Sequence, residues 1–250
     1  MWRSAVGEHA RSVREALKLR RHIHLEPRVQ GLQPAAASRR FPSYLAPAMT
    51  QLPELPLTLS RQEIRKMIRQ RRRALTPEQQ QEMGQQAATR MMTYPPVVMA
   101  HTVAVFLSFD GELDTQPLIE QLWRAGKRVY LPVLHPFSAG NLLFLNYHPQ
   151  SELVMNRLKI HEPKLDVRDV LPLSRLDVLI TPLVAFDEYG QRLGMGGGFY
   201  DRTLQNWQHY KTQPVGYAHD CQLVEKLPVE EWDIPLPAVV TPSKEIGRAS

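Results

Sequence analysis

The sequence predicts an α/β fold: a single three-layer domain whose central, mostly parallel sheet is flanked by helices. Short runs of β-branched and aromatic residues alternate along the chain with segments of helical character, and this alternation is typical of such sheets. Several strand-like runs are apolar throughout, as expected for strands that are covered on both faces. A chain of 250 residues is long enough to bury the core of one such domain.

Two helices are expected near the start of this domain. Ser60 with Glu63 forms a capping box, and so does Thr76 with Gln79, so helices should begin near residues 61 and 77. Two further helices are expected: DTQPLIEQLWRAGK (114–127), which Gly126 ends, and a segment from about Tyr200 to Trp207. The expected strands are TVAVFLSF (102–109), RVYLPV (128–133), LLFLNY (142–147), DVLITPLV (177–184), PVGYA (214–218) and AVVTP (238–242).

The positive charge of the chain is confined to its first 50 residues. The net charge is +6. Residues 1–50 contain nine Lys or Arg and three Asp or Glu, which leaves 22 of each type in residues 51–250. The predicted domain is therefore neutral, and this argues against nucleic acid as its partner.

We divide the chain into a basic leader (residues 1–55) and an α/β domain (residues 56–245). Three interpretations of the leader stay open: a mitochondrial-type transit peptide, a disordered basic arm, or sequence included by a start codon assigned too early, with Met49 or Met67 as later starts. Three glutamates and the lack of a clear amphipathic helix weaken the first interpretation and favour the other two.

Composition argues against several other classes of protein. Cys221 is the only cysteine, so no intrachain disulfide can form and a reducing compartment is favoured. The nine histidines occur singly, without the spacing of a zinc site. No apolar run approaches the roughly 18 residues that would span a bilayer, so no membrane partner is expected.

The stretch RLGMGGGFYDR (192–202) gives the strongest functional signal. Glycines there allow positive φ angles and let backbone N–H groups approach an anion, and they lie between a buried strand and a helix. The pattern is neither a Walker A loop nor a dinucleotide fingerprint. Arg192 before the glycines and Asp201 after them favour a phosphate site with a metal ion, because nucleotide-bound Mg²⁺ needs only one or two protein carboxylates. The glycines are Gly194, Gly196, Gly197 and Gly198.

Two further stretches contain candidate binding residues. Arg61, Arg65 and Arg69 stand four residues apart and should share one face of the first helix, either as a solvated basic face or with one or two arginines gripping phosphate. In SFDGELDT (108–115), Glu112 follows a buried strand and is placed to accept hydrogen bonds from N–H groups of a ligand. Asp233, near the end of the chain, is by itself more typical of a turn. These residues indicate an enzyme that uses ATP, without naming its second substrate.

The stretch PLVAFDEYGQRLGMGGGFYDR resembles the signature of the 5-formyltetrahydrofolate cyclo-ligase (methenyltetrahydrofolate synthetase) family. The resemblance extends over about residues 58–243 and includes the arginine-rich helix, FLSFDGELDT, KRVYLPV, LKIHEP and LPVEEWDIPLPAVVTP. It implies a ribose-phosphate-isomerase-like α/β domain that uses Mg²⁺ and ATP to convert 5-formyltetrahydrofolate to 5,10-methenyltetrahydrofolate through an imidate phosphate.

The resemblance also implies roles for individual residues. Arg192 would be catalytic and would neutralise charge on the transferred phosphoryl group. Phe109, Glu112 and Tyr200 would contact the folate, and Asp201 and Asp233 would bind Mg²⁺. The residues expected to bind ATP are Arg61, Arg65, Arg192, Gly194, Gly196, Gly197, Gly198, Phe199 and Tyr200. We expect a cytoplasmic monomer whose partners are ATP and a reduced folate.

The chain departs from the family pattern at three positions, and none removes the mechanism. Phe199 stands where tyrosine is common, Gly197 where some members have lysine, and Arg61 where lysine is frequent. Two alternatives remain: another ATP-dependent kinase or ligase on a similar frame, and a protein that stores folate without converting it.

Overall fold

The computed structural model describes residues 59–247, and the predicted leader lies outside this range. The helices are α2 (Arg61–Arg73), α3 (Pro77–Thr93), α4 (Pro95–Met99), α5 (Gln116–Arg124) and α6 (Phe199–Leu204). The strands are β1 (Thr102–Ala104), β2 (Arg128–Leu134), β3 (Leu142–Tyr147), β4 (Leu153–Met155), β5 (His161–Pro163), β6 (Val170–Leu171), β7 (Val178–Thr181), β8 (Ala185–Phe186), β9 (Arg192–Leu193), β10 (Gln213–Tyr217), β11 (Ala238–Val240) and β12 (Glu245–Gly247).

One eight-stranded sheet organises the described residues, in the order β12-β11-β10-β7-β1-β2-β3-β6. The five strands from β11 to β2 run parallel, whereas β12 at one edge and β3 and β6 at the other pair antiparallel. The pairs β4–β5 and β8–β9 form separate two-stranded sheets. The predicted α/β fold with a mostly parallel central sheet is confirmed.

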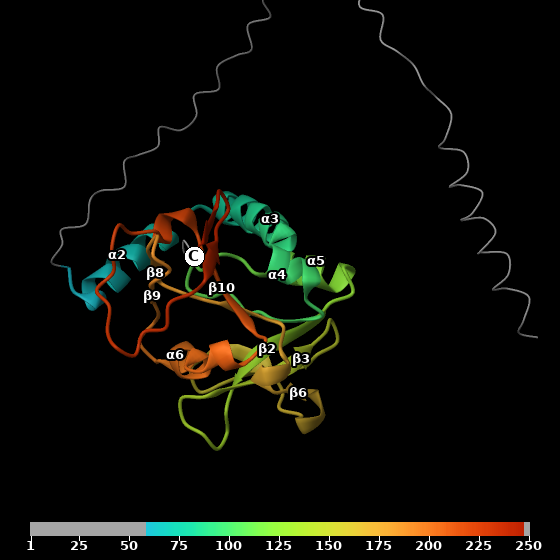
Figure 1. Cartoon of the computed structure of the whole chain (residues 1–250). Coiled ribbons are helices and arrows are strands. Elements are labelled where there is room, and N and C mark those ends of the chain that lie inside the picture. The colour runs from blue at the N-terminus through green and yellow to red at the C-terminus, as the bar shows by residue number, and fades with distance from the viewer. Residues whose placement is uncertain (1–58, 248–250) are drawn as a thin grey trace, which may run out of the picture. The chain divides into compact units, whose positions relative to one another are not determined.

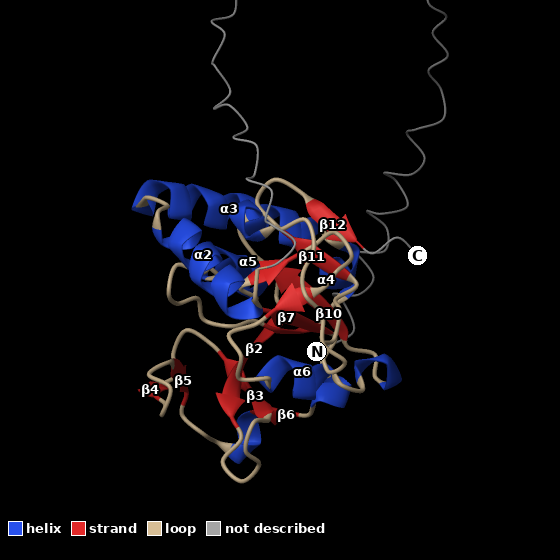
Figure 2. Cartoon of the chain, turned by 90° about the vertical axis from the view of Figure 1, so that its left-hand side faces the viewer, coloured by secondary structure: helices blue, strands red, loops and turns tan. Residues whose placement is uncertain are grey.

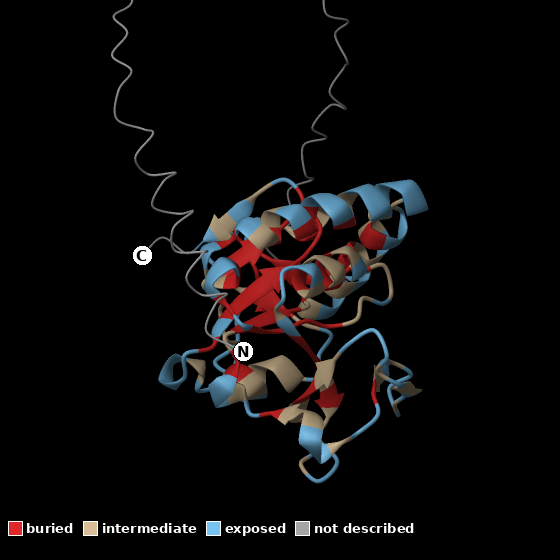
Figure 3. Ribbon diagram, turned by 90° about the vertical axis from the view of Figure 1, so that its right-hand side faces the viewer, coloured by how far each residue is buried: buried red, intermediate tan, exposed pale blue. Residues whose placement is uncertain are grey.

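Helices cover both faces of the sheet (Figure 1). Alternate residues of the parallel strands point to opposite sides: Val103 faces the core beneath α3, α4 and α5, whereas its neighbour Ala104 faces the core on the side of α6. In Figure 3 the central strands are buried and the outer helix faces are exposed. Burial of each large side chain on α5 contributes roughly 1.5–3 kcal/mol; these are Leu118, Ile119 and Leu122.

Helix α2 packs on a third apolar cluster beside the β8–β9 hairpin. Ile64 and Ile68, one helical turn apart, are buried against residues of that hairpin, including Ala185 and Leu193. Both predicted capping boxes are present, at Ser60 for α2 and at Thr76 for α3. This cluster therefore holds α2 beside the β8–β9 hairpin, which leads into the glycine stretch.

Some elements differ from expectation. The predicted strand 102–109 is regular only to Ala104, because the following segment leaves the sheet after Val105 donates to the carbonyl of Tyr130. The helix predicted over about 200–207 covers Phe199–Leu204 and is followed by a 3₁₀ turn. The two-stranded pairs, β6 and β12 were not predicted. The described residues include no helix that is both long and apolar enough to cross a membrane.

The parallel topology brings the segments with the functional signals to one edge of the sheet. The carboxyl ends of β1, β2 and β7 lead into the segments after Ala104, Leu134 and Thr181. Ligands of such sheets bind where these ends meet. Figure 2 shows α2 above this edge and the β4–β5 pair apart from the main sheet.

Candidate active site

A cavity of about 760 Å³ opens at this edge. Its volume lies in the usual range for small-molecule sites. Twelve of the thirteen predicted site residues line it: Arg61, Arg65, Phe109, Glu112, Arg192, Gly194, Gly196, Gly197, Gly198, Phe199, Tyr200 and Asp201. The remaining one, Asp233, does not line the cavity but accepts hydrogen bonds from Arg61, which does.

The glycine loop (residues 194–198) connects β9 to α6. Gly196 and Gly198 have φ angles of 99° and 65°, which disfavour residues with a Cβ. A Cβ at Gly198 would lie 2.7 Å from Nη1 of Arg202. Two of the four glycines are therefore required by backbone conformation. Gly194 is different, because the nearest atom to a Cβ there would be Nη1 of Arg192 at 3.9 Å.

Arg202 holds this loop in place from the side of α6. Its Nη2 donates to the carbonyl of Gly197 at 2.6 Å, and its Nε donates to the carbonyl of Gly140 at 2.8 Å. The guanidinium also lies over the ring of Phe199, 5.6 Å from its centroid. Arg202 was part of the quoted signature, but sequence reasoning assigned it no role.

The three arginines on one face of α2 contact three different segments. Arg61 makes two hydrogen bonds to the carboxylate of Asp233, of which Nη2 to Oδ1 is 2.9 Å. The Nε of Arg65 donates to the carbonyl of Gly194 at 2.8 Å. Arg69 donates to Asp110 at 2.7 Å and does not line the cavity. Two of these arginines thus reach the cavity, and the face is more than a solvated one.

Arg192 is a nearly buried cation at the cavity wall, with 4% of its surface exposed. Its Nη2 donates to Oδ1 of Asp201 at 2.5 Å. Burial lowers the pKa of Arg192, and the charge of Asp201 opposes this effect. An arginine pKa lies far above neutrality, so the side chain remains a cation in a site of low polarity.

Asp201 and Asp233 lie within the electrostatic range of the same two arginines. Each of these carboxylates raises the pKa of both Arg61 and Arg192. Burial opposes ionisation of Asp233, but its hydrogen bonds with Arg61 and with the backbone N–H of Glu230, together with the charges of Arg61 and Arg192, lower its pKa. Among residues 59–247 no three His, Cys, Asp or Glu side chains cluster as a metal site. Two carboxylates nevertheless fit Mg²⁺ that arrives with a nucleotide, because phosphates and water complete its coordination.

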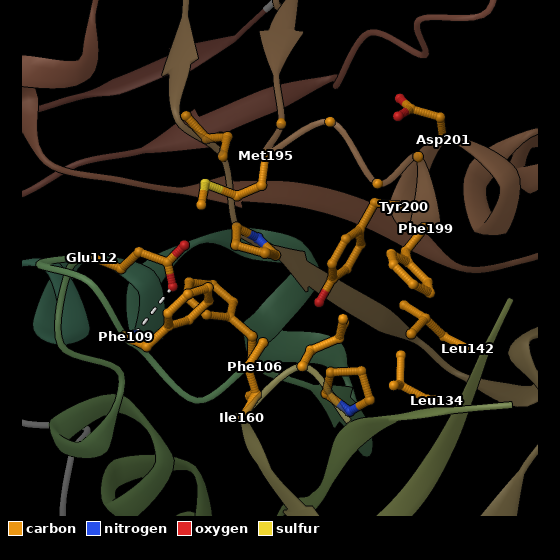
Figure 4. A pocket seen from close by; sticks show the side chains of 18 of the residues that line it. Phe106, Phe109, Glu112, Leu134, Leu142, Ile160, Met195, Phe199, Tyr200 and Asp201 are labelled. Carbon is orange, nitrogen blue, oxygen red and sulfur yellow. Dashed lines mark hydrogen bonds between the residues drawn. The ribbon is translucent and has the colours of Figure 1, made fainter. Parts of the chain in front are cut away.

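Glu112 is the one buried carboxylate among the residues that line the cavity, with 7% of its surface exposed. Its Oε2 accepts a hydrogen bond from the backbone N–H of Phe109 at 3.3 Å (Figure 4). Burial raises the pKa of Glu112 to about 7, although Arg72 on α2 opposes this rise. Near neutral pH this group therefore lies close to the midpoint between an acceptor carboxylate and a neutral acid.

Apolar and aromatic side chains form the rest of the wall. In Figure 4 the ring of Tyr200 lies between Glu112 and Asp201, and its hydroxyl points into the cavity. Burial raises the pKa of Tyr200, so the phenol is neutral. Sequence reasoning missed further lining residues, of which Figure 4 labels Phe106, Leu134, Leu142, Ile160 and Met195. Trp232 also lines the cavity. Ile160 lies in the quoted block LKIHEP, which could have indicated it.

Comparisons with known proteins agree with this geometry. The family model described as the 5-formyltetrahydrofolate cyclo-ligase family matches residues 58–242. A 5-formyltetrahydrofolate cyclo-ligase from Haemophilus influenzae is 53% identical over 179 residues, which cover 72% of this chain and 96% of the relative. One from Mycolicibacterium smegmatis is 31% identical over 190 residues, which cover 75% of this chain and 96% of the relative.

Solved structures show the same fold. The NMR structure of a 5,10-methenyltetrahydrofolate synthetase from Aquifex aeolicus superposes with a TM-score of 0.66 at 27% identity, and covers 77% of this chain and 94% of its own. A structure from Mycoplasma pneumoniae, at 21% identity and a TM-score of 0.58, supports the fold alone. By the extent of the family match and the identity to its relatives, the chain belongs to the 5-formyltetrahydrofolate cyclo-ligase family of enzymes.

Proposed function

We propose that this chain converts 5-formyltetrahydrofolate to 5,10-methenyltetrahydrofolate in a reaction that consumes ATP and requires Mg²⁺. The observation that supports it most is the division of the cavity. Arg61, Arg65 and Arg192 contact Asp233, the glycine loop and Asp201, respectively. Glu112 lies beside Phe109, across Tyr200 from Asp201 (Figure 4). The first part suits a triphosphate, and the second suits a flat heterocycle with N–H groups.

The proposed folate end uses hydrophobic contact and one specific acceptor. Phe109 and Tyr200 offer aromatic surface to the pterin ring, and ionised Glu112 accepts hydrogen bonds from its N–H groups. A buried carboxylate without such donors is costly, so this end favours ligands that supply them. In Figure 4 Glu112 and Asp201 lie on different sides of Tyr200, which leaves the central region for the reacting groups.

The proposed chemistry is a phosphoryl transfer followed by ring closure. The formyl oxygen attacks the γ-phosphorus of ATP, the bond to the bridging oxygen breaks, and ADP leaves. N10 of the folate then attacks the formyl carbon, loses its proton, and the phosphate departs as the five-membered ring closes. Arg192 would stabilise the negative charge that develops on the transferred group, and the N–H groups of the glycine loop would bind the other phosphate oxygens.

Asp201 and Asp233 are the residues that would hold Mg²⁺. When bound, Mg²⁺ neutralises phosphate charge and orients the triphosphate. Arg61 and Arg65 would bind phosphate oxygens beside it, since arginine offers paired donors in a fixed plane. We further propose that the chain acts as a monomer in the cytoplasm.

The direct test is an absorbance assay. Mixing the full chain with 5-formyltetrahydrofolate, ATP and Mg²⁺ should produce the near-ultraviolet band of methenyltetrahydrofolate, and Asp201→Ala should abolish it. Omitting ATP or chelating Mg²⁺ should also stop the reaction.

Each other result points to an alternative. ATP binding without any band would favour a different phosphoryl acceptor on the same frame. Folate binding without ATP consumption would favour a storage protein. Release of ADP and inorganic phosphate without the absorbance band would contradict ring closure, while the transfer of the phosphoryl group would still stand.

A further inference from the structure

A buried polar cluster adjoins Glu112, and its other members do not line the cavity. Its members are Arg72 on α2, the turn at Asp110 and Gly111, and His219 after β10. Arg72 and His219 each have no exposed surface. The predicted mechanism uses none of them, although burying a cation is costly unless it serves a partner.

Arg72 joins the helix to the turn that carries Glu112. Its Nη2 donates to the backbone carbonyl of Asp110 at 3.1 Å, and its Nη1 lies 3.9 Å from Oε1 of Glu112. A Cβ at Gly111 would lie 3.4 Å from the backbone of Arg72, so the turn packs directly against the helix. The guanidinium therefore contacts both the backbone of the turn and its functional side chain.

Two neighbouring arginines on α2 also bind the same turn, through the side chain of Asp110. Asp110 has a φ of 52°, a left-handed conformation that is uncommon for a residue with a side chain. Its carboxylate accepts hydrogen bonds from Arg69 and from Arg73, with the Nε distances both 2.7 Å. Arg72 also lies 3.7 Å from Oδ2 of Asp110, but the charge of Glu112 has the larger effect on its pKa, and the three arginines together fix the turn around the Glu112 carboxylate.

The groups that face Glu112 come from four directions. Asp110 is on its own turn, Tyr200 is on α6 and Arg72 is on α2, whereas His219, after β10, lies against the backbone of Gly111 and Glu112. Burial raises the pKa of Tyr200 and lowers the pKa of His219 to about 4, so both are uncharged at neutral pH. Within residues 59–247, Arg72 is the one basic side chain that lies within 4.0 Å of Glu112.

We propose that Arg72 is a positioning residue for folate binding, whose guanidinium favours the ionised form of Glu112 and holds it as an acceptor for pterin N–H groups. This inference rests on the proposed function. The balance of charges supports it: burial raises the pKa of Glu112 and Arg72 lowers it. Without the cation the carboxyl would be protonated at neutral pH, and it would then have less capacity to accept two hydrogen bonds.

The test compares Arg72→Met, which keeps the buried stem, with Arg72→Lys, which keeps the charge. In Arg72→Met we expect KM for 5-formyltetrahydrofolate to rise about tenfold at neutral pH, the scale of one charge-assisted hydrogen bond. The rise should shrink at alkaline pH, where Glu112 ionises without help, and kcat at saturating folate should change little. Arg72→Lys should restore most of the affinity. Arg71→Met is the matched control, because Arg71 is adjacent and its described contact is with the sulfur of Met67.

A second measurement needs no substrate. An infrared titration of the carboxyl band, with Glu112→Gln to assign it, should show a midpoint near 7 in the wild-type chain and a higher midpoint in Arg72→Met. Equal midpoints, or equal KM changes in the Met and Lys variants, would overturn the role of Arg72. If Arg72→Met does not fold, Arg72→Lys still tests the proposal, because a tenfold rise in KM or a clearly higher Glu112 midpoint despite the retained charge would overturn it. An inactive wild-type chain with the expected midpoints would count against the proposed function alone.

Discussion

Arg192 places a positive charge where water is largely excluded, and this sets how much it contributes to a transition state. With 4% of its surface exposed and a hydrogen bond to Asp201, the guanidinium is held in one position before any ligand binds. A preorganised donor of this kind is worth about 10²–10³ in kcat. We therefore expect Arg192→Gln to reduce kcat by about that factor while binding of 5-formyltetrahydrofolate largely persists, as fluorescence titration would measure.

The control for this prediction is Arg124→Gln. Arg124 also donates to a carboxylate, Glu120, but on an exposed helix surface, and it does not line the cavity. It should leave both kcat and folate affinity unchanged. Parallel loss of turnover and folate binding in Arg192→Gln would instead indicate that Arg192 maintains the cavity itself.

The glycines of the loop should respond differently to the same substitution. Gly198→Ala forces a Cβ into a left-handed conformation and against Arg202, so we expect a loss of about 1–2 kcal/mol in the free energy of unfolding and weaker ATP binding. Gly194→Ala meets no close neighbour and should keep its stability within about 0.5 kcal/mol. Its methyl group would narrow the cavity, so only KM for ATP should rise. Urea denaturation with ATP kinetics on both variants measures the contrast, and equal stability losses would contradict it.

Residue by residue, the sequence predicted best where chemistry and local pattern coincide. The glycines, Arg192 and Asp201 lie within ten consecutive positions, so the short chain segment itself keeps them close together. Arg72 was one of three consecutive arginines and showed no sign of being buried. His219 likewise stands in an ordinary polar stretch. Burial of a charged or polar residue depends on tertiary packing, so the local sequence pattern does not indicate it.

At the scale of elements, α2 connects the nucleotide side of the cavity to the folate side. Arg61 and Arg65 near its start line the cavity, and Arg72 near its end contacts the turn of Glu112. The position of this helix therefore affects both ends of the site. Its start depends on the capping box, in which the backbone N–H of Ser60 donates to Glu63 at 2.8 Å.

Loss of this cap should affect both stability and catalysis. We expect Ser60→Ala to lower the free energy of unfolding by about 1 kcal/mol and to raise KM for ATP, because Arg61 is the first helical residue. Thr76→Ala removes the equivalent cap of α3, which does not line the cavity, and should cost similar stability without changing KM. Thermal unfolding and ATP kinetics on both variants measure this. An unchanged KM in Ser60→Ala would show that the first turn stays ordered without its cap.

Elements with strong local signals were predicted, and those that depend on distant partners were not. The caps of α2 and α3 and the runs of β2, β3 and β10 were found because their signals lie within the elements themselves. Two-residue strands such as β8 and β9 exist only through their pairing with each other. The segment after Ala104 has the apolar character of a strand, but it lines the cavity instead, since Phe106 and Phe109 face the site. An apolar run of residues is equally compatible with a buried strand and with the wall of a cavity, so composition alone did not distinguish the two.

At the scale of the whole fold, two buried groups give the stability opposite pH dependences. Burial raises the pKa of Glu112 from 4.5 to about 7, so its favourable contribution to folding is complete below 4.5 and is lost as pH rises through 7. Burial lowers the pKa of His219 from 6.5 to about 4, so its contribution is complete above 6.5 and is lost as pH falls through 4. Each shift corresponds to about 3 kcal/mol. Between 4.5 and 6.5 the two effects oppose each other.

We therefore expect the free energy of unfolding of the wild-type chain to change little with pH in this range. In variants that lack one of the two groups it should change with pH, in opposite directions. His219→Gln leaves Glu112 unopposed, so the free energy of unfolding should rise as pH falls from about 7 to about 5. Glu112→Gln leaves His219 unopposed, so it should fall over the same interval. Urea denaturation at both pH values gives each slope, and the cost of each substitution cancels because each variant is compared with itself. Each variant retains one of the two groups, so slopes of the same sign would contradict the opposite pKa shifts of Glu112 and His219 and, with them, the account of a flat wild-type profile.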